Sequence, residues 1–322
     1  MKRFSKILYV SEPSVEQTGS IAQVIALCRS NQADLTLIEV IPPPTPGMVM
    51  PPGGPSADDL AVTRISNARK ALISLLGPDA DHDVDIDVRV GTKFMEVIRA
   101  VLEDGYDLVI KPAENPDWIE RLFGSDDMHL LRKCPCPVWL MKPQKKTVYE
   151  TVVAAIDFDP NEVDIDRDEQ ALNDQILEFA SALALAESAE LHLVHVWDAP
   201  EAGFISMWTD DPAKAEVSLV EGERARHEAG MDSRIQMLRS CLGEETYDYI
   251  SPRVHVLMGS PRKAIPSLVS DLGADVLVMG TVARTGIPGL FIGNTSEAIL
   301  DQLKCSVLAV KPAGFVTPIK PE

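Results

Sequence analysis

The residues best suited to chemistry lie in a glycine-rich segment, GTVARTGIPGLFIGNT at 280–295. The segment follows a short apolar run and precedes a helix-forming stretch, so it is predicted to join a strand to the start of a helix. At such a junction, free backbone N–H groups and the positive end of the helix dipole can hold an anion, and glycine at 280 would let the anion approach the backbone. The other candidate ligand contacts are Arg284, Gly293, Asn294 and Thr295. The alternative interpretation is that these glycines only form a turn and a helix cap.

Other phosphate and nucleophile motifs are absent from the sequence. It contains no G-x-x-x-x-G-K-[ST] motif and no G-x-S-x-G elbow, and residues 157–161 lack the glycines of a dinucleotide-binding turn. No general base can be assigned from the sequence. Binding without catalysis is therefore the expectation, with slow ATP hydrolysis as a weaker alternative.

An internal repeat sets the domain organisation. Residues 89–110 match residues 257–278 at a spacing of 168, and the match continues at a spacing of 169 after one inserted residue, Ile292. The pairs that hold this register include Gly91 and Gly259, Asp107 and Asp275, Gly124 and Gly293, and Cys136 and Cys305. We therefore predict two copies of one domain, at 1–145 and 148–313, joined by a polar linker near 144–147.

Each copy alternates short apolar runs with longer segments of helical period, which is typical of a parallel sheet covered by helices on both faces. In the first copy we expect strands near 6–11, 33–40, 84–90, 107–111 and 136–142, and helices near 16–30, 57–76, 93–103 and 126–133. In the second copy we expect strands at 151–156, 190–196, 252–257, 274–279 and 305–311, and helices at 168–187, 212–241, 262–271 and from 294. The fold class is thus α/β, with five parallel strands in each copy.

Composition limits the partners. The formal net charge is −19 and the pI is near 4.7, which opposes binding to nucleic acids and to anionic membranes. No apolar run approaches the roughly 20 residues that a membrane-spanning helix needs. The five cysteines are odd in number and scattered, which suits a reducing compartment and not a disulfide framework. We expect a cytoplasmic protein with a small-molecule ligand.

The second copy resembles the universal stress protein (UspA) superfamily, whose domains have a Rossmann-like fold of the adenine nucleotide alpha hydrolase type. Its ATP-binding members have a G-x2-G-x9-G-[ST] loop after the fourth strand, which corresponds here to Gly280, Ala283, Gly293 and Asn294, followed by Thr295. The resemblance implies that Asp157 binds the ribose or base, that the backbone near Val196 meets adenine, and that the loop holds the phosphates of ATP, with or without Mg²⁺. Ala283 replaces a glycine, which costs roughly 1 kcal/mol if that position needs a positive φ.

The first copy departs from this pattern. The segment KPAENPDW at 111–118 stands where the glycine loop should be, and Glu114 and Asp117 would repel a phosphate. Only Gly124 and Ser125 remain of the motif. We expect a structural or regulatory half without nucleotide, which pairs with the second copy as an intramolecular equivalent of the family's dimer; a homodimer of the whole chain is also possible.

Three further features have interpretations other than a metal site. The acidic segments 79–87 and 157–168 lack the glycine of a calcium loop and are interpreted as solvated surface. His129, Cys134 and Cys136 do not complete a tetrahedral metal set, so core thiols are expected. The segment 198–213 is more apolar than a solvated loop should be, and could be a lid over a ligand or an interface.

Two functions from different classes follow. The leading hypothesis is a stress-linked, non-catalytic sensor of adenine nucleotides that acts through its second copy. The competing hypothesis is a carrier or scaffold that binds an apolar or lipid-like ligand, in which the glycine loop is vestigial.

Overall fold

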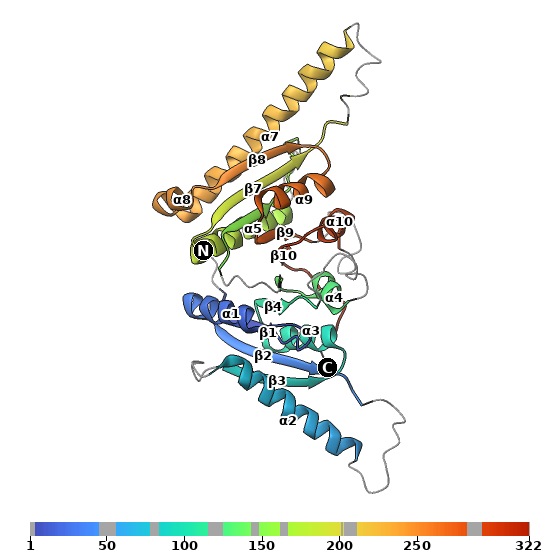
Figure 1. Ribbon diagram of the computed structural model, residues 1–322. Coiled ribbons are helices and arrows are strands. Elements are labelled where there is room, and N and C mark those ends of the chain that lie inside the picture. The colour runs from blue at the N-terminus through green and yellow to red at the C-terminus, as the bar shows by residue number, and fades with distance from the viewer. Residues whose placement is uncertain are drawn as a thin grey trace. The chain divides into compact units, whose positions relative to one another are not determined.

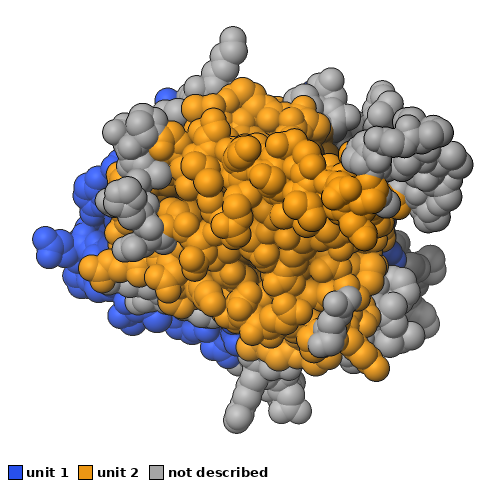
Figure 2. Space-filling model, turned by 90° about the horizontal axis from the view of Figure 1, so that it is seen from below, with its two compact units in different colours: residues 1–2, 149–284, 293–305 blue, residues 3–148, 285–292, 306–322 orange. Residues whose placement is uncertain are grey.

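The computed structural model describes residues 4–44, 56–77, 84–114, 125–142, 148–161, 167–200, 202, 211–281 and 292–321. These residues form two compact units, coloured separately in Figure 2. Unit 1 contains the described residues between 149 and 281 and between 293 and 305, and unit 2 contains those between 4 and 148 and between 306 and 321, together with Ile292. The units follow the two copies of the repeat, except that residues 306–321 cluster with the first copy.

Unit 2 alternates strands and helices along the first copy (Figure 1). Its elements are β1 (Lys6–Val10), α1 (Thr18–Asn31), β2 (Asp34–Ile41), α2 (Ala57–Leu76), β3 (Val84–Val90), α3 (Lys93–Asp104), β4 (Leu108–Pro112), α4 (Asp126–Lys133), β5 (Val138–Met141) and β10 (Ser306–Val310). The strands lie in the order β3-β2-β1-β4-β5-β10. The first five are parallel to one another, whereas β10 pairs antiparallel with β5.

Unit 1 repeats the plan with longer helices. Its elements are β6 (Thr151–Ala155), α5 (Arg167–Glu187), β7 (Glu190–Trp197), α7 (Pro212–Leu242), α8 (Glu244–Ile250), β8 (Arg253–Met258), α9 (Pro261–Leu272), β9 (Val276–Gly280) and α10 (Asn294–Leu300). The strands are parallel in the order β9-β6-β7-β8. Consecutive residues of β6, β7 and β9 are buried, which shows that both faces of this part of the sheet are covered.

The repeated residues have repeated structural roles. Gly105 and Gly273 end α3 and α9 in the left-handed conformation, with φ of 71° and 61°. Just beyond them, Asp107 accepts a hydrogen bond from the backbone N–H of Ser5 at 2.7 Å, and Asp275 accepts one from Glu150 at 2.7 Å. In each copy, therefore, an aspartate at the start of the fourth strand holds the start of the first strand.

The α/β class and the tandem arrangement are confirmed, but two details differ from expectation. Because β10 joins β5 in antiparallel pairing, the sheet of unit 2 is mixed and not purely parallel. Helix α8 was not expected; its seven residues, EETYDYI, include none that is buried, so they carry no apolar stripe. None of the described helices combines the length and apolar character needed to cross a membrane.

Candidate functional site

A cavity of about 320 Å³ lies in unit 1 at the carboxyl ends of β6 and β9. These two strands are paired in parallel, with Ala155 beside Met279, so their ends meet at the same edge of the sheet. Open α/β sheets bind ligands at this edge, and the cavity volume is at the lower end of the range for small-molecule sites. The cavity is therefore the candidate site of unit 1.

The structure brings most of the predicted site residues together. Of the eight residues named from the sequence, six line the cavity: Asp157, Val196, Gly280, Gly293, Asn294 and Thr295. They come from four separate segments of the chain, so their convergence was not set by proximity in the sequence. The remaining two, Ala283 and Arg284, lie outside the described residues.

Asp157 is held in place by Asn173 of α5. The Asn173 side chain accepts a hydrogen bond from the Asp157 backbone N–H at 3.1 Å and donates one to the Asp157 carbonyl oxygen at 2.6 Å. Asn173 is buried and also lines the cavity. Its role was missed in the sequence, although a signal exists: it shares a helix face with buried Ile176 and Ala180, where a polar residue needs a partner.

One side of the cavity is apolar. Leu172 and Ile176 of α5, Ile265 of α9 and Met279 of β9 line it. Leu172 also explains Gly280, because a Cβ atom at that position would lie 3.0 Å from the Leu172 Cδ2 atom. Gly280 thus allows close packing of β9 against α5, and the apolar side can cover the face of a flat heteroaromatic ring.

The start of α10 forms another part of the cavity lining. Gly293 precedes this helix with φ of −61° and makes no side-chain cap hydrogen bond. Its backbone N–H donates to the Thr281 carbonyl oxygen at 3.0 Å, and the Ser296 hydroxyl donates to the Gly280 carbonyl oxygen at 3.1 Å. These bonds fix α10 against the end of β9, with Asn294 and Thr295 lining the cavity.

The charged side chains among the described residues that line the cavity are acidic. Asp157 and Glu169 are among its lining residues, and none of the described residues that line it is a lysine, arginine or histidine. A bare polyphosphate would therefore be repelled, whereas hydroxyl and amino groups could donate to the carboxylates. A phosphate ligand would bind best as its Mg²⁺ complex, in which the cation offsets these charges.

Two histidines of β7 flank this region on separate sides. His195 Nε2 lies 2.8 Å from His227 Nδ1 of α7, and Phe158 stacks on the His195 ring with centroids 3.9 Å apart. His192 Nδ1 instead lies 2.9 Å from His255 Nε2 of β8. The two β7 histidines thus have different partners and pack on separate sides of the strand. Among the described residues, no group of three or more potential ligands could hold a metal ion.

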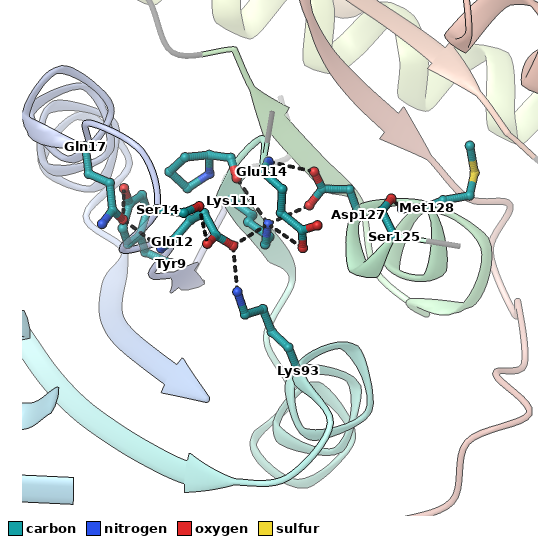
Figure 3. A network of polar contacts seen from close by, with 11 residues as sticks. Tyr9, Glu12, Ser14, Gln17, Lys93, Lys111, Glu114, Ser125, Asp127 and Met128 are labelled. Atoms are coloured by element: carbon teal, nitrogen blue, oxygen red, sulfur yellow. Dashed lines mark hydrogen bonds and ion pairs between the residues drawn. The ribbon is translucent and has the colours of Figure 1, made fainter. Parts of the chain in front are cut away.

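At the corresponding position of unit 2 lies a network of charged side chains (Figure 3). Glu12 follows β1 as Asp157 follows β6, and Lys111 lies in β4 with no exposed surface. Lys111 Nζ lies 2.6 Å from Asp127 Oδ1, 3.1 Å from Glu12 Oε2 and 3.4 Å from Glu114 Oε1. Lys93 adds a second cation, 2.6 Å from Glu12 Oε2. We call these five side chains the Lys111 cluster.

The charges of the Lys111 cluster pair with one another inside unit 2. Asp127 lies in the first turn of α4, where the helix dipole favours a negative charge. Its carboxylate accepts a hydrogen bond from the Glu114 backbone N–H at 2.9 Å. Burial alone would raise the pKa of Glu12, but Lys111 and Lys93 outweigh it and lower that pKa to about 2. Burial lowers the pKa of Lys111, but Asp127 and Glu12 outweigh it, so that pKa is raised.

Both copies also fix the acid after the first strand with a carboxamide. The Gln17 side-chain oxygen accepts a hydrogen bond from the Glu12 backbone N–H at 2.9 Å, as the Asn173 oxygen does from Asp157. The two units thus share a scaffold around the acid. They differ in what the carboxylate faces: a cavity in unit 1, and Lys93 and Lys111 in unit 2.

Comparison with known proteins agrees with the fold and the repeat. The sequence profile of the universal stress protein family matches residues 3–142 and 163–311. Universal stress protein E of Escherichia coli K12 is 30% identical over 241 residues, which cover 74% of this chain and 72% of that protein. The universal stress protein E homolog of Haemophilus influenzae is 24% identical over 319 residues, which cover 97% and 98%.

Solved structures show the same fold. A functionally unknown protein from Pseudomonas aeruginosa PAO1 superposes with a TM-score of 0.65 at 23% identity, covering 96% of this chain and 93% of that one. A universal stress protein from Archaeoglobus fulgidus gives a TM-score of 0.58 at 16% identity, covering 97% and 98%. The chain belongs to the universal stress protein family. This membership supports a role in the stress response.

Proposed function

We propose that unit 1 binds an adenine nucleotide in the cavity at the ends of β6 and β9, and that the chain serves the stress response as a non-catalytic nucleotide sensor. The observation that carries this inference is the convergence of six sequence-predicted residues around one cavity. That cavity combines an apolar side with a helix start, which are the two environments that a nucleotide requires.

The chemistry of the lining suggests how such a ligand would lie. The base would occupy the apolar side beside Val196, Leu172 and Ile265. The Asp157 carboxylate would accept hydrogen bonds from ribose hydroxyls or from the base amino group. The phosphates would lie toward Asn294 and Thr295 at the start of α10, with Mg²⁺ offsetting the acidic lining.

The test is calorimetric titration of ATP with Mg²⁺ into the full-length protein and into a Gly293→Asp variant. Aspartate suits this position structurally, because φ of −61° and ψ of 138° are ordinary values for a helix N-cap and aspartate is a favoured cap. We therefore expect Gly293→Asp to fold normally and to weaken micromolar binding at least about tenfold through charge repulsion. Gly293→Ser is the neutral control and should retain binding.

Binding that Gly293→Asp leaves unchanged would place the nucleotide elsewhere, and no binding to the parent protein would refute the proposal. Adenosine and AMP should be titrated as well, because tighter binding of adenosine than of ATP would show that the acidic lining selects the nucleoside. A co-purified apolar molecule, detected by native mass spectrometry, would instead support the carrier hypothesis.

A further inference from the structure

Unit 2 holds two cysteine thiols in contact with each other. Cys134 follows the last residue of α4 and Cys136 precedes β5, and the two Sγ atoms are 3.6 Å apart. Cys134 has no exposed surface, Cys136 is 9% exposed, and both are free thiols. A disulfide bond has an S–S distance of about 2.05 Å, so an approach of about 1.5 Å would join them.

A buried lysine accompanies the two thiols. Lys311 follows β10, is 3% exposed, and its Nζ donates a hydrogen bond to the Leu131 carbonyl oxygen in the last turn of α4. Burial lowers the pKa of Lys311 to about 7, and interaction with Cys134 and Cys136 opposes this shift. A buried ammonium is costly without an anion nearby, and a thiolate supplies one.

The two thiols are not equivalent. Burial would raise the pKa of Cys134, but its hydrogen bond with Cys136 and the charge of Lys311 outweigh burial, so the pKa of Cys134 is lowered. The same hydrogen bond, together with burial, raises the pKa of Cys136. The pKa of Cys134 thus lies below that of Cys136, so Cys134 is the thiol of the pair that ionises first.

We propose that Cys134 and Cys136 form a peroxide-reactive dithiol that closes to a disulfide, with the buried Lys311, hydrogen-bonded to the last turn of α4, supplying the positive charge that favours the Cys134 thiolate. None of the described features of the cavity in unit 1 takes part, so this reaction is independent of nucleotide binding. The site would give the chain a direct response to oxidants of the peroxide class.

The reaction balances with one peroxide. The Cys134 thiolate attacks one peroxide oxygen, the O–O bond breaks, and the departing hydroxide takes a proton from the Lys311 ammonium to give water. The Cys136 sulfur then attacks the sulfur of the Cys134 sulfenic acid. The S–O bond breaks, and the sulfenic oxygen leaves as a second water with the Cys136 proton. Two electrons pass from the two sulfurs to the peroxide.

The other cysteines provide internal comparisons. Cys28 and Cys305 are buried, like the pair, and Cys241 is exposed. Burial, with a contribution from Asp34, raises the pKa of Cys28 to about 12, so its thiolate is scarce at neutral pH. Oxidation at the pair that spares Cys28 and Cys305 would therefore show reactivity that burial alone does not explain.

The experiment treats the reduced full-length protein with graded hydrogen peroxide, unfolds it in an alkylating reagent, and maps the peptides by mass spectrometry. We expect the peptide that contains Cys134 and Cys136 to lose both alkylation sites and two hydrogen atoms, and dithiothreitol to restore them. Cys28 and Cys305 should stay alkylated. Two intact thiols at peroxide doses that oxidise Cys241 would overturn the proposal, as would over-oxidation without a disulfide.

Variants distinguish the role of Cys136 from that of Lys311. Cys136→Ser should trap a sulfenic acid at Cys134, detectable with dimedone, and should form no disulfide. Lys311→Met should slow disulfide formation at least about fivefold at neutral pH and move the pH midpoint of the rate upward, because the thiolate loses its cation. Lys142→Met, at the matching position of the first copy, should leave the rate unchanged. An unchanged pH profile in folded Lys311→Met, or equal effects of the two lysine variants, would refute the role of Lys311.

Discussion

At the scale of single residues, the two copies use the same position in opposite ways. Asp157 lines a cavity in unit 1, whereas Glu12 in unit 2 contacts Lys93 and Lys111 at 2.6 Å and 3.1 Å. A buried ion pair of this kind stabilises a protein weakly when complete, but removing one partner leaves an uncompensated charge. The contribution of the Lys111 cluster to stability therefore depends on its charged partners all being present.

This dependence predicts the effect of removing the central cation. Lys111→Met should lower the free energy of unfolding by about 3–5 kcal/mol, because Asp127 would remain buried without its cation and Glu12 would keep only Lys93. Urea denaturation of the full-length protein would measure the loss. Lys93→Met is the control: that side chain is 19% exposed and forms an ion pair with Glu12 at the edge of the cluster, so its loss should be about 1 kcal/mol.

A double variant tests whether the unpaired Asp127 carboxylate causes this loss of stability. Lys111→Met combined with Asp127→Leu removes a cation and its partner together, and it should recover part of the lost stability. Equal losses for the Lys111 and Lys93 variants would show that the buried charge at 111 is not the stabilising centre of the cluster.

At the scale of elements, a carboxamide on or before the first helix of each copy fixes the chain after the first strand. Asn173 does so from within α5 and Gln17 from the residue before α1. Asn173→Leu should weaken nucleotide binding in unit 1 at least about fivefold, because the Asp157 backbone would lose both hydrogen bonds that hold it beside the cavity. Calorimetric titration would measure this change.

Gln17→Leu is the matched control for that variant. It removes the equivalent hydrogen bond from Glu12 and should destabilise unit 2, yet it should leave the affinity for nucleotide unaltered. If the two variants weakened binding equally, the effect would come from general destabilisation and not from the placement of Asp157.

The elements themselves were largely predictable from the sequence. The helix expected at 57–76 is found at Ala57–Leu76, and that expected at 212–241 is found at Pro212–Leu242, because apolar periodicity and capping residues are local signals. Convergence of the predicted site residues also followed from the rule that ligands bind at the carboxyl ends of parallel strands. The antiparallel pairing of β10 with β5 was not predictable, since strand partners depend on the whole fold.

The Lys111 cluster could not be predicted for a related reason. Its charged residues lie at positions 12, 93, 111, 114 and 127, and no spacing rule links them before the sheet is assembled. From the sequence, Glu114 and Asp117 indicated only that phosphate would be repelled. The structure adds that Lys111 is buried among carboxylates, whereas a lysine in a strand would ordinarily be placed at the surface.

At the scale of the whole molecule, the two copies divide their roles. Unit 1 retains a cavity, and unit 2 has its counterpart filled by internal charges and holds the Cys134–Cys136 dithiol. A ligand that binds only the folded state of one unit should stabilise that unit by about 2.7 kcal/mol at a concentration 100 times its Kd. At the corresponding position of unit 2, Asp127 and Lys111 already pair with each other.

Hydrogen exchange of the full-length protein tests this division directly. With ATP and Mg²⁺ at saturation, we expect slower amide exchange in β6 (Thr151–Ala155) and α10 (Asn294–Leu300), which border the cavity, because bound ligand opposes local opening. Exchange in β1 (Lys6–Val10) and α4 (Asp126–Lys133), which border the Lys111 cluster, should not change. The Gly293→Asp variant under the same conditions supplies the baseline. Equal protection of all four segments would mean that nucleotide acts on both copies, so that unit 2 is not a ligand-independent half.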